Sequence, residues 1–137
     1  MPPRDEKLEL IQAVPLFAYC GPQELEAIAS SADLIEVPEG LALVEQGQHT
    51  NEFVVIAEGE VEVTRDGAHV ATLGSGDFFG EIALVMGAPR TATVTSTEPS
   101  TLLVLTDRAF WRLAEEAPSI QTSVLKVLAE RLHGATV

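Results

Sequence analysis

Glycines recur at close intervals through the middle of this chain, and their spacing constrains the fold more than any other feature. Eight of the 10 glycines lie between residues 33 and 106. The runs between them are mostly apolar or alternate with a period of two, which is typical of short strands. This pattern predicts a small antiparallel β-roll or barrel. The predicted strands are Leu34–Val37, Leu41–Val44, Phe53–Ala57, Glu60–Thr64, His69–Leu73, Thr91–Thr97 and Thr101–Leu105.

Turn and helix signals complete this outline. The pair Asp66-Gly67 predicts a two-residue hairpin between two of the strands. Before the strands, residues 5–14 are expected to form a short helix that ends at Pro15, and Gly21-Pro22 is expected to open a second one. After them, Asp107 is the predicted N-cap of a further helix.

A last helix is predicted from Ser119 to Leu132, after Pro118. Its apolar residues fall on one stripe, which is typical of a face that packs against a core or against a second copy of the chain. The residues of this stripe are Ile120, Val124, Val127, Leu128 and Leu132.

Composition limits the partners of the chain. A length of 137 residues indicates one domain. There are 21 acidic and 8 basic residues, for a formal net charge of −13, which argues against nucleic acid or an anionic membrane as a partner. No DNA-reading helix pair and no direct membrane insertion are expected. The lone Cys20 allows no internal disulfide. No signal core or membrane-length apolar run is present, so a cytoplasmic location is expected.

The stretch from Phe79 to Ala92 combines groups that suit an anion. Gly80 allows close approach of a backbone, and residues 81–84 can form a helical turn whose N–H groups point outward. Arg90 follows Pro89 and offers a planar fork for phosphate oxygens. Residues 33–106 carry 12 acids and only two cations, so Arg90 stands out as a specific ligand. The alternative is a glycine-rich β-turn in which Arg90 makes a structural salt bridge.

This stretch resembles the phosphate-binding cassette of the cyclic nucleotide-binding domain family, F-G-E-[IL]-A-L, a short spacer, then [PQ]-R-[TSA]-A. Every signature position is filled between residues 79 and 92. The resemblance implies an α+β, mainly β fold, with an antiparallel eight-stranded β-roll (jelly-roll-like), short N-terminal helices and two C-terminal helices. It implies a single domain, residues 1–137, in which 1–32 are the helical lead-in, 33–106 the β-roll and 107–137 the C-terminal helices.

The resemblance also implies a role for each cassette residue. Arg90 would bind the cyclic phosphate, with backbone N–H groups of Ile82, Ala83 and Thr91 as further donors. Glu81 would accept a hydrogen bond from the ribose 2′-OH, and Gly80 would leave room for the sugar. The implied ligand-binding residues are Gly80, Glu81, Ile82, Ala83, Arg90, Thr91 and Ala92.

The function implied is that of a cAMP or cGMP sensor or regulatory module, with the nucleotide as ligand and no cofactor. The last helix would cover the base as a lid and pass the signal to an effector protein or a homodimer partner. Thr91 would let cGMP bind as well, although cAMP is the expected natural ligand.

Two other functions remain open on the sequence. A degenerate domain would serve protein interaction only, and a cupin-like metalloenzyme would need several histidines around a metal. The three histidines, His49, His69 and His133, are widely spaced, and no pair of a nucleophile and a histidine base stands out. We therefore expect neither a metal site nor catalytic residues.

Overall fold

The computed structural model describes residues 4–80 and 87–135, with side chains over 7–80, 87–126 and 128–130. Within these ranges, eight strands form two antiparallel four-stranded sheets, in the orders β1-β8-β3-β6 and β2-β7-β4-β5. The predicted fold class, an antiparallel eight-stranded β-roll with helices at both ends, is confirmed. The strands are β1 (Asp33–Val37), β2 (Ala42–Val44), β3 (Glu52–Glu58), β4 (Glu60–Arg65), β5 (Ala68–Gly74), β6 (Phe78–Phe79), β7 (Thr93–Ser96) and β8 (Ser100–Thr106).

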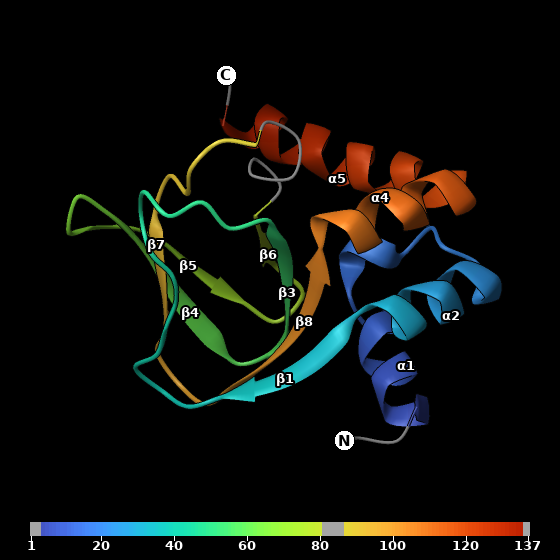
Figure 1. Ribbon diagram of the computed structural model, residues 1–137, viewed down its shortest axis with the longest axis horizontal. Helices are drawn as coiled ribbons and strands as arrows, with labels where there is room; N and C mark the ends of the chain where they lie inside the picture. The colour runs from blue at the N-terminus through green and yellow to red at the C-terminus, as the bar shows by residue number, and fades with distance from the viewer. Residues whose placement is uncertain (1–3, 81–86, 136–137) are drawn as a thin grey trace.

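The helices gather on one side of the β1-β8-β3-β6 sheet, and the second sheet lies on the other side (Figure 1). They are α1 (Arg4–Gln12), the 3₁₀ turn η1 (Pro15–Phe17), α2 (Pro22–Ser31), α4 (Asp107–Glu116) and α5 (Pro118–Ala135).

Strand β3 lies between two cores, which explains its unbroken apolar sequence. Phe53 and Val55 belong to the core under the helices, whereas Val54 and Ile56 belong to the core between the two sheets. Both faces of the strand are therefore covered. β6, which was not predicted as a separate strand, pairs with Val54 and Val55 and adds an edge to the same sheet.

The predicted Asp66-Gly67 hairpin is confirmed. The φ angles are 55° at Asp66 and 81° at Gly67, both in the left-handed region that a tight two-residue turn requires. Arg65 pairs with Ala68 across the turn.

The predicted N-cap of α4 was wrong by one residue. Thr106, not Asp107, precedes the helix in extended conformation, and its Oγ1 accepts from the backbone N–H of Ala109 at 3.1 Å. Both residue types cap well, so the boundary depends on where β8 ends. Asp107 lies instead in the first turn, where its charge complements the helix dipole.

The first half of α5 is anchored to the N-terminal helices. The buried Ser123 hydroxyl donates to the backbone carbonyl of Leu16 in η1. The Ser119 hydroxyl donates to Glu24 in α2 at 2.8 Å, and this hydrogen bond lowers the pKa of the Glu24 carboxyl. Of the predicted apolar stripe, Ile120 and Val124 are buried in the core and Leu128 packs against it, while the side chains of Val127 and Leu132 lie outside the described residues.

Candidate functional site

The stretch predicted to bind an anion begins at the end of β6 and ends just before β7. The structure describes Gly80 at its start and residues 87–92 at its end. Three predicted ligand-binding residues, Glu81, Ile82 and Ala83, lie outside the described residues. The described part of the site consists of its two ends, which lie next to each other.

Gly80 packs against the start of β3 and against Arg90. Its φ angle is +100°, a value that residues other than glycine rarely adopt. A Cβ atom at this position would lie 2.5 Å from the carbonyl oxygen of Glu52 and 2.8 Å from Nη1 of Arg90. Only glycine therefore lets the chain leave β6 so close to the guanidinium.

Arg90 is held in place by the segment between β2 and β3. Its side chain is 6% exposed, and it is the only charged side chain that is buried in the described part of the chain. Its Nε donates to Thr50 Oγ1 at 2.7 Å, and its Nη2 donates to the carbonyl oxygen of Glu52 at 2.7 Å. The arginine therefore has a fixed plane rather than the freedom of a surface side chain.

The backbone of Arg90 is bound to the same segment. Its N–H donates to the carbonyl oxygen of Gln48 at 2.8 Å, and its carbonyl accepts from the N–H of Gly47 at 2.8 Å. Sequence reasoning predicted Arg90 but missed Thr50 and Glu52 as its partners. No local pattern marks them, because they lie 40 and 38 residues away along the chain.

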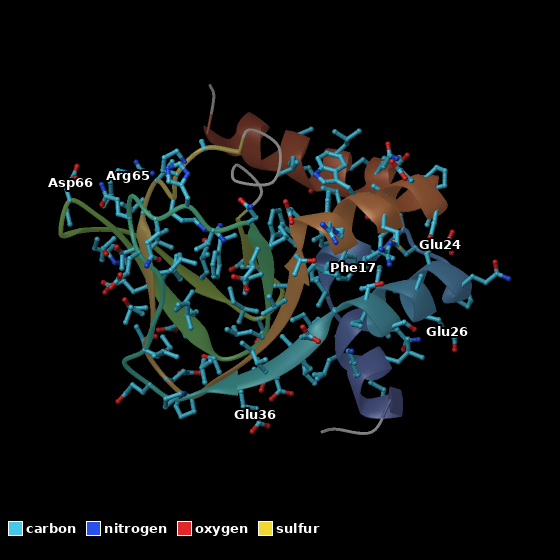
Figure 2. The ribbon with its side chains drawn as sticks, in the orientation of Figure 1. Phe17, Glu24, Glu26, Glu36, Arg65 and Asp66 are labelled. Carbon is cyan, nitrogen blue, oxygen red and sulfur yellow. The ribbon has the colours of Figure 1, made fainter. Side chains whose placement is uncertain are left out.

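The last two predicted ligand-binding residues differ in exposure. Thr91 is exposed, whereas Ala92 is buried in the roll. The carbonyl of Thr91 accepts from Nε of Arg65 at 3.0 Å. Arg65 and Asp66 lie at the outer end of the β4–β5 hairpin (Figure 2), and Asp66 bonds Gln46 through both its carboxylate and its backbone N–H. The hairpin therefore supports the end of the stretch.

The other functional signals lie apart from this site. His69 pairs with Glu62 at 2.8 Å on the exposed face of β4 and β5. Among the residues that the structure describes, no three His, Cys, Asp or Glu side chains are grouped to hold a metal ion. No helix within the described ranges is long and apolar enough to cross a membrane.

Comparison with known proteins agrees with the fold and the motif. The family model for the cyclic nucleotide-binding domain matches residues 34–117. A cyclic nucleotide-gated potassium channel of Rhizobium etli is 36% identical over 126 residues, which cover 92% of this chain and 35% of the channel. A cAMP-dependent protein kinase regulatory subunit of Mycosarcoma maydis is 40% identical over 114 residues, 77% of this chain and 22% of the subunit.

A solved structure gives the same result. The catabolite activator protein of Thermus thermophilus superposes with a TM-score of 0.80 and 28% identity, over 88% of this chain and 59% of that one. The chain spans about a third or less of the two curated relatives named above. The chain belongs to the cyclic nucleotide-binding domain family.

Proposed function

We propose that this regulatory cyclic nucleotide-binding module binds cAMP or cGMP through residues 79–92, with Arg90 as the ligand of the cyclic phosphate. The observation that carries the proposal is the fixed guanidinium of Arg90, buried beside Gly80 at the point where the two ends of the stretch meet. Arginine suits this task because its planar fork can bind two phosphate oxygens at once.

The remaining contacts are assigned by the same proposal. Gly80 leaves room for the ribose, and Glu81 accepts a hydrogen bond from its 2′-OH. Backbone N–H groups of Ile82, Ala83 and Thr91 donate to the phosphate oxygens, and Ala92 closes this end of the site. With a formal net charge of −13, the chain gives an anion no long-range attraction, so affinity depends on these short contacts.

A calorimetric titration tests the proposal. The chain is titrated with cAMP and cGMP, and with 5′-AMP as a control that keeps the base and the ribose but lacks the ring phosphate. Saturable binding of at least one cyclic nucleotide, with much weaker binding of 5′-AMP, is the expected result. Binding of neither cyclic nucleotide would refute the proposal and would favour the alternative of a degenerate domain that serves protein interaction.

The module acts by contact with a protein rather than by catalysis. Burial and the nearby charge of Glu24 raise the pKa of the Cys20 thiol, the reverse of what an activated nucleophile needs. The relatives include a channel and a kinase regulatory subunit, which supports an effector protein, or a second copy of the chain, as the partner of α5. The lone Cys20, which allows no internal disulfide, favours a cytoplasmic setting.

The choice of purine is expected to depend on Thr91. A hydroxyl at this exposed position can accept a hydrogen bond from the amino group of a syn guanine, which adenine lacks. Thr91→Ala should weaken cGMP by roughly 2- to 13-fold, the value of one neutral hydrogen bond, and change cAMP less. Titration of both ligands measures this, with Thr95→Ala on β7 as the control. Equal weakening of the two ligands would mean that Thr91 acts through its backbone only.

Ligand binding is expected to protect the second half of α5. The first half is already held by Ser123 and by buried Ile120 and Val124, so closure over a base would change residues 125–135 most. Hydrogen–deuterium exchange with and without cAMP measures this, and β1 serves as a distant reference. A uniform change along the chain would reflect general stabilisation by the ligand and would contradict a lid.

A further inference from the structure

Along one edge, the guanidinium of Arg90 is bound by the segment that leads into β3. Nε and Nη2 form one edge of the planar guanidinium, and along this edge they donate to Thr50 Oγ1 and to the carbonyl oxygen of Glu52, each at 2.7 Å. Two bonds along one edge fix the rotation of the plane, since a rigid fork cannot keep both if it turns.

The third nitrogen of the guanidinium lies beside the start of the proposed binding stretch. Nη1 lies beside Gly80, so close that a Cβ atom there would be 2.8 Å away. The orientation that Thr50 and Glu52 set is therefore the orientation in which the guanidinium lies beside Gly80.

The segment that carries Thr50 is itself fixed at the two residues that follow it. The carbonyl oxygen of Asn51 accepts from the N–H of Asp107, the first residue of α4, at 2.8 Å. Glu52 pairs with Thr106 as β3 begins. Thr50 is half-buried. Its hydroxyl reaches Arg90 from a backbone segment that the contacts of Asn51 and Glu52 hold in place.

We infer that Thr50 is the positioning residue of the site, and that its hydroxyl sets the orientation in which Arg90 meets the phosphate. Glu52 contributes a backbone carbonyl, which any residue would supply, whereas the hydroxyl of Thr50 depends on the side chain. The inference rests on the proposed function. It adds Thr50 to the site. This residue lies outside residues 79–92, and the proposed function assigns it no contact with the nucleotide.

The test compares two substitutions of nearly the same size. Thr50→Val keeps the shape of threonine and removes the acceptor, while Thr50→Ser keeps the acceptor and removes a methyl group. In Thr50→Val, Arg90 loses the hydrogen bond that orients its guanidinium. The Kd for whichever cyclic nucleotide binds more tightly should therefore rise about tenfold. In Thr50→Ser the Kd should stay within about twofold of the parent. Thr95→Val, on β7, is the control for a threonine-to-valine change elsewhere.

A second measurement reports on the arginine itself. The Nε–H resonance of Arg90 can be identified by its loss in Arg90→Lys. In Thr50→Ser this resonance should keep its chemical shift. In Thr50→Val its chemical shift should change, and the proton should exchange faster with water. Circular dichroism confirms that each variant is folded at the titration temperature. A purely structural role would lower the unfolding temperature without changing the Kd.

The outcomes separate the inference from the function on which it rests. If the parent chain binds neither nucleotide, the proposed function is wrong and the inference is overturned with it. If the parent binds and Thr50→Val binds within about twofold of it, only the inference is overturned. Equal weakening in the valine and serine variants would also overturn it, because the hydroxyl would then not be the cause.

Discussion

Replacing Arg90 with alanine is expected to weaken cyclic nucleotide binding by about 30-fold to several-thousand-fold. Removing one partner of a buried charge pair costs about 2–5 kcal/mol, mostly because the other charge is left without compensation. Titration calorimetry measures the loss. The matched control is Arg112→Ala, which removes an exposed arginine of α4 that has no assigned role in the site. An Arg90→Ala variant that bound as tightly as the parent would refute the assigned role.

The same variant should also be less stable without ligand. Arg90→Ala deprives Thr50 and the Glu52 carbonyl of a charged donor, and such a loss at a buried group costs about 1–3 kcal/mol. Urea unfolding measures this change in the free energy of unfolding. Titrations must therefore be made at a temperature at which the variant is fully folded, so that weak binding is not mistaken for unfolding.

Replacing Phe53 with alanine is expected to lower the free energy of unfolding by about 3–5 kcal/mol, the range for a large aromatic removed from a core. Phe53 is 1% exposed, and its ring centroid lies 5.4 Å from that of Phe78 and 5.6 Å from that of Phe110. It therefore joins α4 to both β3 and β6. Urea unfolding at constant pH measures the loss.

The control for Phe53→Ala is Val70→Ala on β5. Val70 is 48% exposed, so its truncation should change the free energy of unfolding by less than about 0.5 kcal/mol. A loss below about 1 kcal/mol in Phe53→Ala would mean that the three rings do not bind α4 to the sheet.

Local chemistry explains which parts of the fold could be predicted from the sequence. Asp66-Gly67 was predicted correctly because a tight turn needs two residues with positive φ, and that need is met within the pair itself. The start of α4 was misplaced because Thr106 and Asp107 are equally good caps, and only the end of β8 distinguishes them. β6 was missed because it has two residues and exists through its pairing with β3.

The same reasoning applies to the site. Gly80 and Arg90 could be identified because they belong to one continuous motif, and the structure brings the two together. Thr50 and Glu52 could not, since their contacts with Arg90 arise only when β3 and β6 pair. The ligand roles of Glu81, Ile82, Ala83, Thr91 and Ala92 stay predictions.

The loop between β2 and β3 has a consequence for protein engineering. Surface loops usually accept insertions and deletions with little loss. Here, however, Gly47 and Gln48 bond the backbone of Arg90, and Thr50 and Glu52 bond its side chain. One residue, His49, separates these two sets of bonds, so an added or deleted residue would force one set to break. A reporter domain inserted into this exposed loop would therefore break contacts that hold Arg90, although the sequence of the loop suggests that it would tolerate an insertion.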